Sequence, residues 1–186
     1  MQGLIKIFGY LIIVNTLLFY SCSSNQFSDK IKALDSLSLE VERLIDSIKL
    51  EDTTIYINAA KNIDKNLKLI QKELKDTISK DEAQILSDYK MIRKSLLNYP
   101  DKIKSIYNEL VYSKKQLNAL SKDLSRGYIE ASKAEEYFSL EVTSTQTVLE
   151  EGWSTINNSP IYLKMFEELH PKVLNFMENH QISESQ

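Results

Sequence analysis

His170 and His180 are the side chains of this sequence best suited to acid–base or metal chemistry. They stand ten residues apart in a segment with helical spacing. Ten residues correspond to about 1000° of helical turn, so the two side chains diverge by roughly 80°. They therefore do not form a chelating pair, and the only cysteine, Cys22, lies too far away in the sequence to complete a zinc motif. We expect two surface histidines and no metal site.

Acidic residues form the second arrangement that could do chemistry, because they occur as adjacent pairs. The pairs are Asp81 with Glu82, Glu135 with Glu136, Glu150 with Glu151, and Glu167 with Glu168. Neighbours on a helix point about 100° apart, so the carboxylates of a pair do not clasp one ion or share one proton. The sequence has neither a glycine-rich phosphate loop nor a serine in a nucleophile elbow. It predicts no catalytic residue and no cofactor, and the chain is not expected to be an enzyme.

Cys22 directly follows the most apolar stretch of the chain, apart from one serine. One basic side chain, Lys6, precedes an apolar run over residues 7–20, and small polar residues end the run. This order is typical of a signal peptide. The run is shorter than the about 20 apolar residues of a membrane-spanning helix, which favours export over permanent spanning. A single cysteine also excludes a disulfide within the chain.

Ser21 and Cys22 resemble the lipobox of bacterial lipoprotein precursors, in which a small residue precedes a cysteine that accepts lipid. Phe19 and Tyr20 depart from that pattern, which usually has leucine and a small residue at these places. The resemblance covers residues 1–22 and implies cleavage before Cys22, with a diacylglycerol on its sulfur and often a fatty acid on its amine. Each buried methylene contributes roughly 0.8 kcal/mol to membrane affinity, so several acyl chains make release negligible. The alternatives are an ordinary signal peptide cleaved near Ser21 or an uncleaved anchor.

The residues after the cysteine bear on location. Ser23, not aspartate, follows Cys22, which by resemblance to known lipoprotein sorting favours an outer membrane over the inner one. We therefore expect a cell-envelope protein, either periplasmic or surface-facing. Residues 22–27 form a short lipidated tether that reaches ~20 Å at most, so the folded part is expected close to the bilayer.

Composition indicates one helical domain. Removal of residues 1–21 takes one base, Lys6, from the 23 basic residues and leaves 22 against 26 acids, a net charge of −4. A charge this small and mixed gives no basic surface for nucleic acid. The remaining two glycines and three prolines are too few for the turns of a many-stranded β protein. The sequence therefore predicts an all-α fold.

Apolar residues recur at steps of three and four, as on one face of an amphipathic helix. Six such stripes cover residues 31–48, 60–77, 85–96, 103–124, 138–156 and 162–176. Capping boxes are expected at Ser79 with Glu82 and at Ser132 with Glu135, a helix end at Pro100, and a helix start at Ser159 with Pro160. The pattern predicts an elongated antiparallel helical bundle with coiled-coil-like seams over residues 28–180, followed by a disordered tail, 181–186. The stripes are wider than a two-stranded seam, so intramolecular packing is the first expectation and self-association the second.

Large aromatic residues gather along one predicted helical hairpin, at Tyr128, Tyr137, Phe138 and Trp153. Tyrosine suits a surface that is half apolar and half wet. These four rings therefore predict a contact surface for a protein or a glycan. The alternative is that they seal the bundle.

Aspartate precedes serine or threonine in a recurring three-residue pattern. The hydroxyl residues concerned are Ser36, Ser47, Thr53 and Thr77. The pattern resembles the O-glycosylation sequon of some bacteria with exported glycoproteins. It is equally a signal for helix ends.

Together these features predict a lipid-anchored, non-catalytic helical scaffold or protein-interaction module of the cell envelope. Its expected partners are the membrane, through lipid on Cys22, and an envelope protein. The alternative is a binding module in which a groove between helices accepts a small apolar or glycan ligand.

Overall fold

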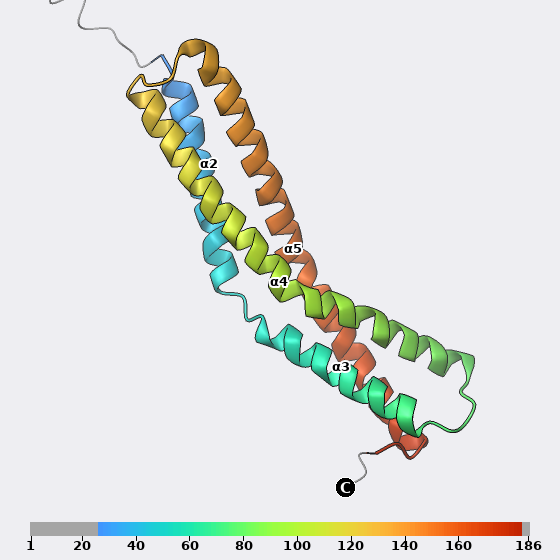
Figure 1. The fold of residues 1–186 in the computed structure, drawn as a ribbon. Helices are drawn as coiled ribbons and strands as arrows, with labels where there is room; N and C mark the ends of the chain where they lie inside the picture. Colours follow the sequence, from blue (N-terminus) through green and yellow to red (C-terminus); the bar gives the residue numbers. More distant parts are fainter. Residues whose placement is uncertain (1–25, 184–186) are drawn as a thin grey trace, which may run out of the picture.

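The computed structural model describes residues 26–183 (Figure 1). The predicted signal peptide, Cys22 and the last three residues of the chain lie outside the described residues. The described part contains four α-helices and no strand: α2 (Ser28–Lys49), α3 (Thr54–Glu73), α4 (Lys80–Ser125) and α5 (Ala131–Asn179). None of the four combines the length and the apolar character that crossing a membrane requires. The all-α prediction is confirmed.

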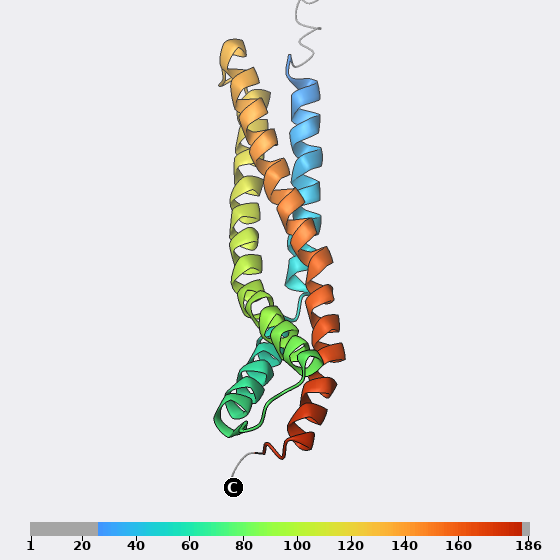
Figure 2. The same ribbon diagram turned by 90° about the vertical axis from the view of Figure 1, so that its right-hand side faces the viewer.

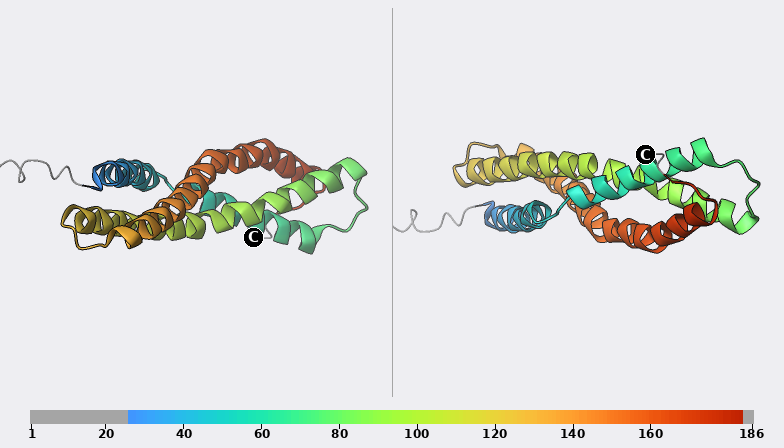
Figure 3. Two further views of the ribbon diagram at one scale, coloured as in Figure 1. Left: turned by 90° about the horizontal axis from the view of Figure 1, so that it is seen from above. Right: turned by 90° about the horizontal axis from the view of Figure 1, so that it is seen from below.

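Two long antiparallel helices, α4 and α5, run the length of the molecule (Figures 1 and 2). With 46 and 49 residues, each extends ~70 Å. Helix α2 packs beside one half of this pair and α3 beside the other half, and α2 and α3 do not pack on each other. The molecule is therefore an elongated three-helix bundle whose first helix is interrupted at residues 50–53. The long helices cross near their middles, a region that we call the waist (Figures 1 and 3).

The buried side chains follow the predicted stripes most closely in α4. All seven stripe positions in its second half are buried: Ile103, Ile106, Leu110, Ser113, Leu117, Leu120 and Leu124. The stripe of α2 includes one buried polar residue, Ser38, whose hydroxyl donates to Oδ1 of Asn118 over 3.1 Å. This hydrogen bond lets a serine occupy a core position without an unpaired polar group.

Proline does not divide the long helices, which corrects two predicted boundaries. Pro100 lies inside α4, and Pro160 lies inside α5 and does not begin a helix. A proline removes one helical hydrogen bond, but packing on both sides can hold the helix together. Leu96 and Ile103 flank Pro100 two turns apart and both are buried, so one continuous helix satisfies both. Six predicted stripes therefore become four helices.

One of the two predicted capping boxes is correct. The Ser79 hydroxyl accepts from the Glu82 backbone N–H over 3.2 Å, and Glu82 Oε2 accepts from the Ser79 N–H over 2.8 Å. The box at Ser132 and Glu135 is wrong, because the N-cap of α5 is Glu130, two residues earlier, and it makes no side-chain cap hydrogen bond. Glu135 instead pairs with Lys30 of α2, and this contact between helices takes its carboxylate away from the helix start.

Helix α5 ends in a hydrogen-bonded turn that includes the first residues of the predicted disordered tail, 181–186. Gln181 adopts a positive φ of 52°, and the Ile182 N–H donates to the Met177 carbonyl over 2.8 Å. This is the Schellman type of helix end, which a hydrophobic contact usually accompanies. Ile182 is accordingly buried, with 5% of its surface exposed. The packed region therefore continues past residue 180.

Candidate functional site

Three grooves lie along the junction of α4 and α5, and each is lined only by these helices and the turn between them. Their volumes are about 360, 300 and 310 Å³. The lining positions recur at helical spacing on α4 between Ser95 and Asp123, and on α5 between Tyr137 and Tyr162. The grooves therefore form one line, which we call the α4–α5 seam, and its length along α4 is about 42 Å.

The first groove lies at the end of the molecule where α4 turns into α5, and we call it the tip groove. It is lined by Gln116, Ala119, Leu120, Asp123, Ile129, Tyr137, Leu140 and Glu141. Leu140 has 64% of its surface exposed and Tyr137 42%, whereas Leu120 is buried. Asp123 and Glu141 add negative charge beside these apolar side chains. An apolar centre with a charged rim is the usual anatomy of a protein-binding surface.

The second groove continues the seam toward the waist, and we call it the middle groove. It is lined by Asn108, Glu109, Tyr112, Ser113, Ser144 and Val148. Tyr112 is the most exposed aromatic of the seam, at 63%. Most of this lining is uncharged, and its single carboxylate, Glu109, accepts from the Ser105 hydroxyl over 3.2 Å.

An ion pair crosses the seam beyond the middle groove. Lys102 Nζ of α4 lies 3.3 Å from Glu151 Oε1 of α5. Both side chains are about half exposed, so solvent screens the pair and its contribution to stability is small. The pair does, however, mark where the third groove begins.

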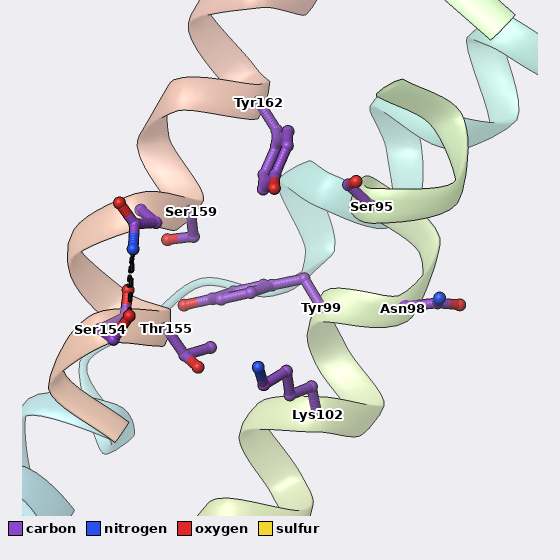
Figure 4. Close-up of a pocket in the computed structure, with 9 residues that line it drawn as sticks. Ser95, Asn98, Tyr99, Lys102, Ser154, Thr155, Ser159 and Tyr162 are labelled. Carbon is purple, nitrogen blue, oxygen red and sulfur yellow. Dashed lines mark hydrogen bonds between the residues drawn. The ribbon is translucent and has the colours of Figure 1, made fainter. Parts of the chain in front are cut away.

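The third groove lies at the waist, and we call it the waist groove (Figure 4). It is lined by Ser95, Asn98, Tyr99, Lys102, Ser154, Thr155, Asn158, Ser159 and Tyr162. In Figure 4 the rings of Tyr99 and Tyr162 and the side chain of Ser95 border one space between α4 and α5. Hydroxyl and amide groups dominate this lining, and Lys102 is its single charged residue.

A buried pair of tyrosines supports the waist groove from the side of α3. The ring centroids of Tyr56 and Tyr99 lie 4.2 Å apart, and each residue is at most 5% exposed. The Tyr56 hydroxyl donates to Ser159 Oγ over 2.9 Å, and the Tyr99 hydroxyl donates to Glu51 Oε2 over 2.8 Å. Burial raises the pKa of both tyrosines, so both remain neutral donors. Ser159 is thus a bridging core residue, which corrects its predicted role as a helix cap.

The structure does not bring together the four aromatic residues of the predicted contact surface. Tyr128, 71% exposed, lies in the α4–α5 turn beneath Arg126. Phe138 is half-buried, with Lys30 Nζ 4.4 Å from its ring centroid. Trp153 is 39% exposed, and 16 positions separate it from Tyr137, which places the two about 160° apart around α5 and ~24 Å apart along it. Only Tyr137 lines the seam.

Gly152, and not Trp153, is the position where α5 approaches the core closely. A Cβ added at Gly152 would lie 2.5 Å from Leu44 Cδ2 and 3.1 Å from Ile106 Cγ2. The predicted stripe used Trp153 at this turn, because a glycine contributes nothing to an apolar pattern. A lone glycine within a helical stripe was the signal for this close approach.

Both histidines are partly buried in structural contacts, so the surface prediction is wrong. His170 Nδ1 lies 2.6 Å from the hydroxyl of the buried Tyr89, and the His170 ring stacks on Phe166. Burial lowers the pKa of His170 and raises that of Tyr89 to about 12. His180 Nε2 lies 3.2 Å from Glu82 Oε1 and so joins the end of α5 to the start of α4. Tyr89 contacts His170 and Phe176 packs against His180. Both partners belong to the apolar stripes, so the spacing of the two histidines did not reveal these contacts.

The hydroxyl residues of the predicted glycosylation pattern lie on different parts of the surface. Ser36 is exposed on α2, and Thr77 is exposed in the connection between α3 and α4. Ser47 is half-buried and its hydroxyl donates to the Arg43 carbonyl over 3.0 Å, while Thr53 directly precedes α3. Modification at these residues stays a prediction, and Ser36 and Thr77 are its most accessible positions.

Comparison with protein-family models, with curated proteins and with solved structures finds no match to this chain. Within residues 26–183, no group of three or more His, Cys, Asp or Glu side chains is placed to hold a metal ion. The seam is therefore interpreted from its own chemistry.

Proposed function

We propose that this chain is a lipid-anchored, non-catalytic interaction module of the cell envelope, and that its contact surface for a protein partner is formed by the tip and middle grooves of the α4–α5 seam. The observation that carries the proposal is the tip groove, where Leu140 and Tyr137 are exposed beside the buried Leu120. Fully burying a leucine side chain is worth about 1.5–3 kcal/mol, and Leu140 is two-thirds exposed. A partner that covers it therefore gains on the order of 1–2 kcal/mol from this residue alone.

The chemistry of the tip groove defines the kind of partner. Its apolar centre is complementary to a segment with apolar side chains. Asp123 and Glu141 are complementary to basic residues beside that segment. An amphipathic helix laid into a groove meets both needs, with apolar anchors at helical spacing and basic flanks. The tip and middle grooves together run from Asn108 to Asp123 on α4, about 22 Å, which accommodates such a helix over about four turns.

The arrangement of the chain supports anchoring at the end that carries the tip groove. The start of α2 and the α4–α5 turn lie at the same end of the molecule (Figures 1 and 2). Gln26, the first described residue, is joined to Cys22 by at most ~14 Å of extended chain. A lipid on Cys22 would therefore hold the tip groove close to the bilayer, and its partner is expected there.

Site-specific crosslinking in living cells tests the proposed contact surface. Leu140→p-benzoylphenylalanine places a photoreactive group in the tip groove, and Leu39→p-benzoylphenylalanine places one on α2, where Leu39 is similarly exposed at 57%. We expect one discrete protein adduct from position 140 and none of that mass from position 39. Adducts of equal yield from both positions, or none from position 140, would refute the proposed surface.

A specific observation also favours a second candidate function, the binding of a small ligand. The waist groove offers hydroxyl and amide groups beside two tyrosine rings. Helical bundles bind ligands between facing helices in this way. Of the two ligand classes expected from the sequence, this lining suits a glycan better than an apolar molecule.

A further inference from the structure

We infer that the waist groove is a binding site for a neutral saccharide of one or two sugar units. It rests on the second candidate function, small-ligand binding, and is independent of the proposed protein partner, because the Lys102–Glu151 pair separates this groove from the middle and tip grooves. Its volume of about 310 Å³ lies at the small end of ligand pockets, which suits a ligand of this size.

Several polar groups of the groove have no hydrogen-bond partner within residues 26–183. The side chains of Ser95 on α4 and Tyr162 on α5 make no hydrogen bond with any other described residue, and both line the groove. They project from facing helices, so a molecule between the helices can reach both at once (Figure 4). Vicinal hydroxyls of a sugar supply donors and acceptors in such an arrangement.

Thr155 provides the most specific observation. Its hydroxyl oxygen is buried and has no hydrogen-bond partner in the described structure, although the residue lines the groove. Buried hydroxyls are nearly always hydrogen-bonded, because leaving one unpaired costs free energy. Thr155 as a residue is only partly buried, so a turn of its side chain about χ1 would bring this oxygen into the groove, where a polyhydroxylated ligand can pair with it and recover that cost.

The tyrosines of the groove provide aromatic ring surface for the apolar face of a sugar. Tyr162 is 37% exposed, so part of its ring is available to a ligand, and the buried ring of Tyr99 borders the same space (Figure 4). A tyrosine ring offers an apolar face with a polar tip, and a sugar ring has an apolar C–H face and a hydroxyl edge. Both surfaces of the ligand therefore find a matching surface.

The charges of the groove exclude other classes of ligand. Lys102 is the one basic residue of the lining, and Glu151 lies 3.3 Å from its ammonium group, which weakens attraction for a polyanion. A purely apolar ligand would bury the free hydroxyls of Ser95 and Tyr162 without partners. A neutral saccharide avoids both penalties.

The groove is also held in shape before any ligand binds. Ser159 accepts from Tyr56 and donates to the Ile156 carbonyl, and Tyr99 is tied to Glu51. These contacts fix side chains from α3, α4 and α5 relative to one another. A preformed site of this kind loses less conformational entropy on binding.

Saturation-transfer NMR on the full-length purified protein tests the inference. The probes are the methyl glycosides of glucose, galactose, mannose, N-acetylglucosamine and N-acetylgalactosamine, with 1-octanol as the apolar probe. We expect saturation transfer to at least one glycoside, with its affinity reduced about fivefold or more by Tyr162→Ala. Tyr128→Ala, the same change at an exposed position of the α4–α5 turn outside the three grooves, is the matched control and leaves the affinity unchanged.

Thr155→Val separates ligand binding from folding. Valine has nearly the same shape and lacks the unpaired hydroxyl, so the variant is expected to be as stable as the parent or more stable, and to bind the glycoside less tightly. No transfer to any glycoside, transfer to 1-octanol alone, or equal effects of Tyr162→Ala and Tyr128→Ala would each overturn the inference. Unchanged binding in Thr155→Val would overturn the role assigned to its hydroxyl.

Discussion

The hydroxyl of Tyr56 donates to the hydroxyl oxygen of Ser159 over 2.9 Å, across a sequence separation of 103 residues. This bond joins the first turn of α3 to the middle of α5, close to where the first helix of the bundle is interrupted. Tyr56 also packs against Tyr99 of α4, so all three helices meet at this point. The waist is thus a fixed joint, and the waist groove is built on this frame.

Removal of the Tyr56 hydroxyl should weaken this joint. Tyr56→Phe keeps the ring and loses one buried hydrogen bond, so the free energy of unfolding should fall by about 1 kcal/mol. Tyr112→Phe, at an exposed position, should change it by less than about 0.5 kcal/mol. Urea unfolding followed by circular dichroism measures both, and equal stability of the two variants would contradict the role of Tyr56.

Addition of a methyl group at Gly152 should destabilise the crossing of α2, α4 and α5. Alanine is favoured over glycine in a helix by about 1 kcal/mol, but its Cβ would overlap the buried side chain of Leu44. Overpacking of a core costs typically 1–3 kcal/mol, so Gly152→Ala should be less stable by about 1 kcal/mol on balance. The exposed Ser154→Ala serves as the control in the same unfolding assay. A Gly152→Ala protein more stable than its parent would show that the close approach is absent.

Mild acid should weaken the packing of α3, α4 and α5 through His170. Burial lowers its pKa in the folded protein below the value of about 6.5 expected in the unfolded chain. The folded state therefore favours neutral imidazole, and the resulting stability is full above pH 6.5 and is lost as the pH falls below it. The parent should lose more stability than His170→Gln between about pH 7 and pH 5. Parallel losses in the two proteins would argue against a buried neutral His170.

Stronger acid should act through Glu82. Hydrogen bonds from Ser79, with a further contribution from His180, lower the pKa of this carboxylate to about 2. A depressed carboxylate pKa contributes stability that is present above the unfolded value of 4.5 and is lost as the pH falls toward 2. Glu82→Gln should flatten the pH dependence of stability in this window, as measured by thermal unfolding. An unchanged acid limb in Glu82→Gln would contradict the assignment.

The spacing of apolar residues predicted most of the core, because burial of one helix face leaves a direct mark on the sequence. In α4 every stripe residue from Ile103 to Leu124 is buried, and the capping box at Ser79 is present. Helix boundaries at proline were wrong for a physical reason. Proline locally favours the end of a helix, but the packing of buried residues on both sides of Pro100 stabilises a continuous helix. That packing depends on partners far away in the sequence.

The candidate site was less predictable than the fold. Tyr137 was identified from its residue type. Tyr162 and Thr155 are site candidates only because of their position on the α4–α5 seam. The seam depends on which face of each helix remains uncovered after α2 and α3 have packed. A single sequence does not specify that choice, and aromatic residues close in sequence, such as Tyr137 and Phe138, end on different faces.

Lipid attachment at Cys22 is tested separately from the contact surface. Cells grown with a labelled fatty acid should incorporate label into the parent chain and not into Cys22→Ser, because the thiol is the expected acceptor. Equal labelling of both chains would refute the anchor and would leave the test of the seam unaffected.

The yield of the crosslink from position 140 in charge-reversed chains shows whether the tip groove holds a protein partner. A partner with basic flanks should lose affinity when Asp123→Lys and Glu141→Lys reverse the charge of the tip groove. Glu167→Lys with Glu168→Lys makes the same change in net charge at exposed positions of α5 beyond the waist, and is the control. We predict a crosslink that is strongly reduced by the first pair of substitutions and retained with the second pair. A yield that is insensitive to both pairs, or reduced equally by both, would contradict this prediction.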